Sequence, residues 1–295
     1  MEQAQRQRPA WLRVKALDAK TREAMLSALS GLHTVCEEAN CPNIGECFGH
    51  GTATFMILGS VCTRNCAFCA VAYGEPAAVD DSEPARLAGA AHRLGLKHVV
   101  ITSVTRDDLA DGGAAQFAAC IRALRRLDPP PAVEVLTPDF QGNWGALRTV
   151  LSEQPEVFNH NVETVARLYP QVRPHADYGR SIAVLAQARR HAEASARGRM
   201  LVKSGLMVGL GESFDEVVVT LGDLRDAGVQ LITIGQYLQP QRGKGHCEVA
   251  RHVAPEEFAS YAEIATEMGF TGVASAPLVR SSYRAESQLR QARLD

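Results

Sequence analysis

The chain has 295 residues, of which 46% are hydrophobic and 22% charged, and its formal net charge is -2. This length and composition suffice for a full apolar core, in one large domain or two small ones. Acidic and basic residues are interspersed and nearly balanced, so we expect no nucleic acid partner. No apolar run approaches the roughly 20 residues of a transmembrane helix, and the start of the chain lacks the apolar region of a signal peptide. We therefore expect a cytoplasmic protein with no membrane partner.

Six of the eight cysteines form two triplets near the start of the chain. They are Cys36, Cys41 and Cys47, spaced C-x4-C-x5-C, and Cys62, Cys66 and Cys69, spaced C-x3-C-x2-C. Thiolates are the preferred ligands of iron–sulfur clusters, and dense cysteines without a secretory signal indicate metal or catalysis rather than disulfides. Each triplet is one ligand short of a closed four-ligand zinc site, although zinc and buried free thiols remain alternatives. We predict two metal sites, and three thiolates on a four-iron cluster would leave one iron open.

From residue 53 onward, short apolar runs alternate with stretches of helical composition. The runs that predict strands are 53–59, 98–104, 132–138, 156–162, 200–210 and 230–238. The stretches that predict helices are 84–95, 113–127, 181–196, 213–227 and 255–268. Strands that alternate with helices indicate parallel βαβ units. The apolar character of each strand on both faces agrees with burial between helices and a barrel interior.

Six such units are two short of a closed eight-fold barrel, so the predicted fold class is α/β, a partial (β/α)6 barrel of the TIM type. The barrel would span 53–269, with an N-terminal extension, 1–52, that carries the first triplet, and a C-terminal extension, 270–295. The second triplet follows the first strand, and the glycine-containing segment 106–114 follows the second. Since loops at the carboxyl ends of the strands form the active site in such barrels, we expect these motifs on one rim.

The motifs together resemble the lipoyl synthase family of the radical S-adenosylmethionine (SAM) superfamily. The C-x3-C-x2-C triplet with Phe68 is similar to the superfamily pattern, and the first triplet together with RSSY at 280–283 is the specific part. The resemblance covers nearly the whole chain. Its other motifs are RPAWLR at 8–13, RDDLADGGA at 106–114, HNVETV at 160–165, KSGLMVGLGE at 203–212 and QYLQP at 236–240.

This resemblance implies a sulfurtransferase that uses SAM and two [4Fe-4S] clusters. One cluster and one electron would cleave SAM to a 5′-deoxyadenosyl radical, which abstracts hydrogen from unactivated C–H bonds; the cofactor performs this chemistry and the protein supplies orientation. Sulfur would enter at C6 and C8 of an octanoyl chain carried on a protein lysine, with the second, auxiliary cluster as donor. A cluster that gives up sulfide needs a labile ligand, and a serine oxygen matches iron–sulfur ligation less well than a thiolate.

The resemblance also implies residue roles. Cys62, Cys66 and Cys69 would hold the SAM cluster, and Cys36, Cys41, Cys47 and Ser282 the auxiliary cluster, with Ser281 as the alternative to Ser282. Without the resemblance, the two serines would be read as a turn. Candidate SAM contacts are Phe68, Asp107, Asp108, Gly112, Gly113, Asn161 and Glu163. Glycines of this kind let the backbone approach a ligand closely.

The implied partners are octanoylated lipoyl carrier domains, namely the E2 subunits of 2-oxoacid dehydrogenases and the glycine cleavage H protein. An electron donor such as flavodoxin or ferredoxin and an iron–sulfur carrier protein would also be required. Two other functions stay open. One is a radical SAM relative that inserts sulfur into another substrate such as dethiobiotin, which RSSY disfavours. The other is an iron–sulfur protein for electron transfer or sensing, which would normally close all cluster ligands.

Overall fold

The computed structural model describes most of the chain. The described residues are 9–13, 23, 29, 31–38, 41, 43, 54–195, 200–241 and 245–293. Of the first cysteine triplet, Cys41 is described in full, whereas the Cys36 side chain and the whole of Cys47 lie outside the described residues. No helix within the described ranges is long and apolar enough to cross a membrane.

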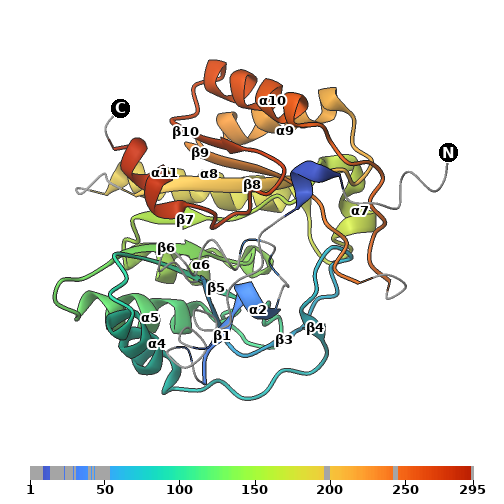
Figure 1. The fold of residues 1–295 in the computed structure, drawn as a ribbon. Coiled ribbons are helices and arrows are strands. Elements are labelled where there is room, and N and C mark those ends of the chain that lie inside the picture. Colours follow the sequence, from blue (N-terminus) through green and yellow to red (C-terminus); the bar gives the residue numbers. More distant parts are fainter. Residues whose placement is uncertain are drawn as a thin grey trace.

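Seven parallel strands follow one another in chain order across a single sheet, and a short antiparallel strand extends that sheet beside the first of them (Figure 1). The strands are β1 His33–Thr34, β2 Thr54–Ile57, β5 His98–Ser103, β6 Ala132–Leu136, β7 Val157–Asn159, β8 Leu201–Val208, β9 Leu231–Gln236 and β10 Gly272–Ser275. Over the described residues no ladder closes β10 onto β1 or β2. The sheet is therefore an open barrel, and the predicted α/β partial-barrel class is confirmed.

Helices connect the strands and cover the outer face of the sheet (Figure 1). The α-helices are α2 Val35–Glu38, α4 Glu83–Arg93, α5 Ala114–Arg125, α6 Trp144–Ser152, α7 Tyr169–Val172, α8 Tyr178–Ala194, α9 Phe214–Asp226, α10 Pro255–Glu267 and α11 Ala285–Gln291. The described residues also contain the 3-10 helices η2 Ala10–Leu12, η3 Phe140–Gly142 and η4 Ala166–Leu168. The helix starts follow local chemistry: Ser213 and Glu216 form a capping box at α9, and Asp177 accepts from the Arg180 N–H at α8.

All six predicted strands and all five predicted helices are present, and among the further elements β10 and α6 continue the alternation of strands and helices. Strand β10 lies within the predicted C-terminal extension and pairs with β9. Its sequence, GVAS, has small residues and no strong apolar run, so only the partner strand reveals it. Helix α6 fills the connection between β6 and β7, where the Asn143 side chain caps its first turn by accepting from the Ala146 N–H. A short amphipathic stretch of this kind is easily taken for a loop.

The core contains one ion pair that is completely buried. Lys203 Nζ on β8 donates to Glu134 Oε1 on β6 over 3.0 Å, and both side chains are at most 1% exposed. Burial opposes the charge on Glu134, but neighbouring Lys203 and His98 still hold the pKa of that carboxyl below its usual range. The Asn159 amide on β7 also donates to Glu134 Oε1, over 3.3 Å. Three adjacent strands are thus joined by polar side chains as well as by their ladders.

Candidate active site

A cavity of about 460 Å3 opens where the carboxyl ends of the parallel strands meet. Its walls come from the loop after β2, the ends of β5 to β9, and the C-terminal segment that carries RSSY. Cavities of this size hold small-molecule cofactors, and in barrel enzymes they form at this end of the strands. The cavity therefore lies at the rim that the order of the motifs predicted, at the carboxyl ends of the strands.

The second triplet lies on the wall formed by the loop after β2. Cys62, Cys66 and Cys69 all line the cavity. A two-stranded parallel pair, β3 Val61–Cys62 and β4 Ala72–Tyr73, closes the base of their loop. Within that loop the Cys69 N–H donates to the Cys66 carbonyl over 3.1 Å, which forms a tight turn.

The environment of these thiols suits cluster ligands. Cys62 Sγ accepts hydrogen bonds from two backbone amides, that of Arg64 at 3.4 Å and that of Thr105 at 3.3 Å, and such N–H donors stabilise a metal-bound thiolate. Burial raises the pKa of Cys66, and it raises the pKa of Cys69 to about 12, so binding to metal would release protons. Among the described residues, no three His, Cys, Asp or Glu side chains are arranged around a single metal ion. The fit to a cluster rests on the shared cavity and the amide donors.

A buried arginine fixes this loop to its neighbours. Arg64, between Cys62 and Cys66, donates from Nε and Nη2 to Asp107 at 2.6 and 2.9 Å, and from Nη2 to Asp139 at 2.7 Å. The Arg64 side chain is 4% exposed. Burial opposes the charge on Asp139, but Arg64 outweighs it and lowers the pKa of that carboxyl to about 2. The cysteine loop is thus held to the loops that follow β5 and β6.

Four of the predicted SAM contacts serve the fold instead of the cavity wall. Asp107 pairs with Arg64, and Asp108 pairs with Arg106 at 2.8 Å. A Cβ added at Gly113 would lie 2.2 Å from a methyl group of Leu58, and both Gly112 and Gly113 have positive φ. None of Asp107, Asp108, Gly112 and Gly113 lines the cavity. The glycines allow close approach as predicted, but they approach other parts of the protein.

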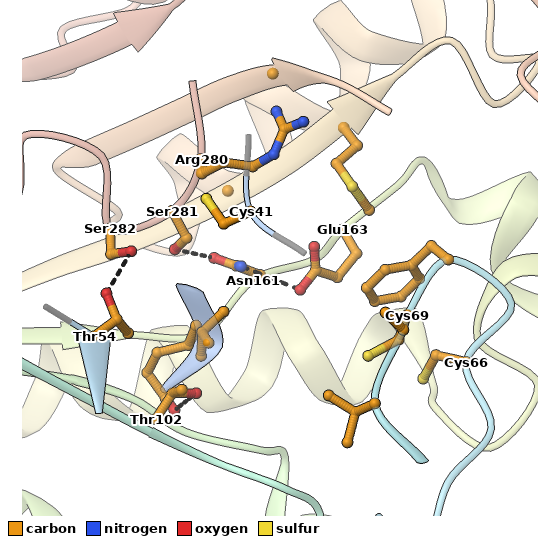
Figure 2. Close-up of a pocket in the computed structure, with 18 of the residues that line it drawn as sticks. Cys41, Thr54, Cys66, Cys69, Thr102, Asn161, Glu163, Arg280, Ser281 and Ser282 are labelled. Atoms are coloured by element: carbon orange, nitrogen blue, oxygen red, sulfur yellow. Dashed lines mark hydrogen bonds between the residues drawn. The ribbon is translucent and has the colours of Figure 1, made fainter. Parts of the chain in front are cut away.

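Three other predicted contacts do reach the cavity, namely Phe68, Asn161 and Glu163. Glu163 has φ +66°, a conformation that is strained for any residue but glycine and that concentrates at functional sites. Two backbone bonds to β8 keep it there, from Glu163 N to the Gly205 carbonyl and from Met207 N to the Glu163 carbonyl. Burial raises the pKa of Glu163. Asn161 Nδ2 donates to Glu163 Oε1 over 3.1 Å, and Figure 2 shows this pair beside Cys66 and Cys69.

Sequence reasoning missed Arg173, which lies at the end of α7 and lines the same part of the cavity. Its Nη1 donates to the carbonyls of Asn161 and Val162 and to the Tyr169 hydroxyl, whereas its buried Nε has no partner among the described residues. Burial disfavours its charge, but Tyr169 and Glu163 keep the pKa of Arg173 above its usual value. A largely buried cation that lines a cavity suits an anionic group of a ligand. No local motif marks Arg173 in the sequence.

The first triplet is represented by Cys41, which lines the other end of the cavity with Arg280, Ser281 and Ser282 (Figure 2). Burial raises the pKa of the Cys41 thiol, and the Asn43 amide and the Arg280 cation oppose that rise. The Asn43 side chain donates to the Leu278 carbonyl over 2.6 Å. The N-terminal and C-terminal segments therefore meet at this end, as the pairing of the first triplet with RSSY predicted.

The two serines of RSSY have different hydrogen bonds. Ser281 Oγ accepts from Asn159 Nδ2 at 2.7 Å and donates to Asn161 Oδ1 at 2.9 Å, so its proton is engaged. For Ser282 the described residues provide one bond, accepted from Thr54 Oγ1 at 2.8 Å. Figure 2 shows Ser282 and Thr54 on the Cys41 side of the cavity. Of the two hydroxyls, Ser282 is the one with free capacity to bind a metal.

Comparison with known proteins agrees with this geometry. The family model for the radical SAM superfamily matches residues 56–224. Among solved structures, the hydrogenase maturase HydG superposes with a TM-score of 0.58 at 13% identity, covering 80% of this chain and 53% of its own. Coproporphyrinogen III oxidase from Escherichia coli superposes with a TM-score of 0.52 at 15% identity, over 78% and 56% of the two chains. At these identities the superpositions show the fold alone. Fold and family model together define a radical SAM protein.

Full-length relatives narrow the class. A lipoyl synthase of Rubrobacter xylanophilus is 54% identical over 99% of this chain and 89% of its own. Those of Methylococcus capsulatus and Caldanaerobacter subterraneus are 56% and 54% identical, over 95% and 97% of this chain and 86% and 98% of theirs. The chain belongs to the lipoyl synthase family. Members of this family use SAM and two [4Fe-4S] clusters.

Proposed function

We propose that this protein inserts two sulfur atoms, at C6 and C8, into an octanoyl chain carried on the lysine of a lipoyl carrier domain. One observation carries the proposal: Cys62, Cys66 and Cys69 border one end of a single cavity, and Cys41 and Ser282 border the other (Figure 2). A substrate chain between the two ends would be open to hydrogen abstraction from one side and to sulfur from the other.

The proposed ligand sets rest on these positions and, for Cys36 and Cys47, on the sequence motif alone. Cys62, Cys66 and Cys69 hold the SAM cluster and leave one iron for SAM, while Cys36, Cys41, Cys47 and Ser282 hold the auxiliary cluster. When bound, the first cluster and SAM supply a one-electron C–S cleavage that yields a radical, and the second cluster supplies sulfide. The assignment of Ser282 over Ser281 rests on the single bond that Ser282 accepts.

The chain's own residues bind and orient. Asn161 and Glu163 offer an amide and a carboxyl to the ribose or methionyl group, Phe68 offers an apolar face to the adenine, and the Arg173 guanidinium faces an anionic group such as the SAM carboxylate. The buried Arg64 holds the cysteine loop at a fixed place relative to these groups. Positioning of this kind lowers the barrier because the reacting atoms are already aligned.

The proposed domain organisation has 53–269 as the barrel, 1–52 as the segment of the auxiliary cysteines and 270–295 as the segment of RSSY, whose first residues add β10 to the barrel sheet. The proposed partners are the octanoylated carrier domains named above, an electron donor such as flavodoxin or ferredoxin, and an iron–sulfur carrier protein. A reducing cytoplasm would keep the thiols available for clusters.

The test uses anaerobically reconstituted protein with SAM, dithionite and an octanoylated carrier peptide. We expect about eight irons per chain, for two four-iron clusters, and a peptide that gains the mass of two sulfur atoms. Cys41→Ala should still cleave SAM but add no sulfur. SAM cleavage by the unmodified protein with an unchanged peptide would move the substrate to another class. Four irons and no SAM cleavage would leave only an electron-transfer or sensing role.

A further inference from the structure

Ser281 belongs to a continuous line of hydrogen bonds that crosses the cavity wall. Ser281 Oγ donates to Asn161 Oδ1 over 2.9 Å, and Asn161 Nδ2 donates to Glu163 Oε1 over 3.1 Å. Figure 2 shows the line running from the RSSY segment at the Cys41 end to Glu163 at the Cys66 and Cys69 end. The line therefore joins the two ends that the proposed function assigns to different clusters.

The line is anchored to a rigid part of the sheet. Asn159, which is fully buried on β7, donates to Ser281 Oγ over 2.7 Å and to Glu134 Oε1 over 3.3 Å. Glu134 is in turn paired with Lys203 over 3.0 Å. A charged and fully buried pair resists displacement, because moving either partner alone would leave an uncompensated charge in the core. Ser281 is thus held both by Asn159 of the sheet and by Asn161 of the cavity wall.

Close packing also fixes the Asn161 amide. A Cβ added at Gly205 would lie 2.9 Å from Asn161 Oδ1 and 2.4 Å from Thr233 Oγ1, so only glycine leaves room for the amide here. Asn161 uses its oxygen toward Ser281 and its nitrogen toward Glu163. A ligand that binds Asn161 or Glu163 therefore acts on the same amide that holds Ser281.

We propose that Ser281 is a positioning residue, not a cluster ligand, and that it couples SAM binding to the placement of the adjacent Ser282. This inference rests on the proposed function. SAM bound against Asn161 and Glu163 would fix the orientation of the Asn161 amide. The hydrogen bond from Ser281 to that amide would then hold the RSSY segment in place. By linkage, if bound SAM favours the placed RSSY segment, the placed segment favours SAM binding by the same factor. The loss of the Ser281 hydroxyl should therefore weaken SAM binding.

The test measures the dissociation constant of SAM for the reconstituted protein without reductant, together with the iron content. Ser281→Ala should keep about eight irons and bind SAM about three- to tenfold more weakly, the effect of one net hydrogen bond. Ser281→Thr keeps the hydroxyl and should stay within about twofold of the unmodified protein. Ser275→Ala is the matched control, because it removes a partly buried serine hydroxyl that donates to the Phe258 carbonyl over 2.7 Å, outside the cavity wall. It should leave SAM binding unchanged.

Three outcomes would overturn the inference. In the first, Ser281→Ala binds SAM as the unmodified protein does. In the second, it loses auxiliary iron while SAM binding is unchanged, as expected for a ligand. In the third, Ser275→Ala weakens SAM binding as much as Ser281→Ala does. If the unmodified protein itself binds no SAM or holds only four irons, the proposed function fails instead, so the two failures are distinguishable.

Discussion

The loop that carries Cys62, Cys66 and Cys69 and the segment that carries Ser281 and Ser282 border one cavity, but different forces hold them. The cysteine loop is fixed by charge-assisted bonds from Arg64 to two carboxylates, each worth about 1.5–3 kcal/mol. The Ser281 and Ser282 hydroxyls accept bonds from a neutral amide and a neutral hydroxyl, each worth about 0.5–1.5 kcal/mol.

Backbone hydrogen bonds also hold the cysteine loop. Ala67, between Cys66 and Phe68, donates to the Val172 carbonyl over 2.9 Å and accepts from Cys247 N over 2.8 Å. The loop is therefore clamped from both sides. We infer that the firmly held loop suits a cluster that must stay in place through catalysis, whereas the Ser282 hydroxyl, with one neutral side-chain bond in the described part of the chain, suits a ligand that must let go.

Replacement of a proposed ligand in the cysteine loop should have the largest effect on iron content and activity. Cys66→Ala should lose about four irons and all reductive SAM cleavage, because two thiolates do not hold a cluster with one open iron. Iron analysis and quantification of 5′-deoxyadenosine check this. Cys247→Ala is the control, since that thiol lies on a neighbouring loop, and it should keep both properties. Unchanged SAM cleavage in Cys66→Ala would refute the ligand assignment.

Removal of the anchor of the firm loop comes next. Arg64→Ala leaves the buried Asp139 with Arg180, at 3.2 Å, as its one cationic partner in the described part of the chain, and should lower the free energy of unfolding by about 3 kcal/mol. Arg167→Ala, which breaks an exposed pair with Glu216, should cause no measurable change. Guanidinium denaturation of both variants checks the difference. If the two variants are equally stable, the buried network does not hold the loop.

Much of this contrast follows from the sequence, and part of it does not. The spacing of the six cysteines and the alternating apolar runs predicted the barrel and the rim that carries the site. The partners of Arg64 come from two distant loops, so no local pattern showed that Asp107 would face an arginine instead of SAM. Arg173 and β10 likewise depend on neighbours far along the chain. Ser282 was predicted by resemblance, and its difference from Ser281 needed the hydrogen bonds.

The third prediction is a pH dependence of stability that comes from His160, which lines the cavity. Burial lowers the pKa of His160 to about 4, below its ordinary value near 6.5. The unfolded chain then binds the proton first, so stability should fall as the pH drops from about 6.5 toward 4, by about 1 kcal/mol at pH 5.5. Denaturation at pH 7 and 5.5 checks this. His160→Asn should reduce the slope and the exposed His92→Asn should not; equal slopes in both would contradict a neutral His160.

The smallest effect on cluster retention is expected at the Ser282 hydroxyl. Thr54→Val removes the hydrogen bond to Ser282 at nearly constant volume. Auxiliary iron should then pass to a chelator about two- to fivefold faster, the range of one weak hydrogen bond. Thr63→Val is a comparison in the firm loop, where Thr63 accepts from Asp107 N. Faster loss of iron from the SAM cluster than from the auxiliary cluster in Thr54→Val would reverse the contrast.

We infer that the SAM cluster stays intact while the auxiliary cluster is lost during turnover. The most direct test of this inference is the iron that remains after one turnover. Mössbauer spectra of reconstituted protein before and after a single turnover with the octanoylated peptide would measure it. The account predicts a fall from about eight irons to about four, with the remaining signal lost in Cys66→Ala and kept in Cys41→Ala. Sulfur insertion with all the iron retained, or with equal loss from both clusters, would contradict it.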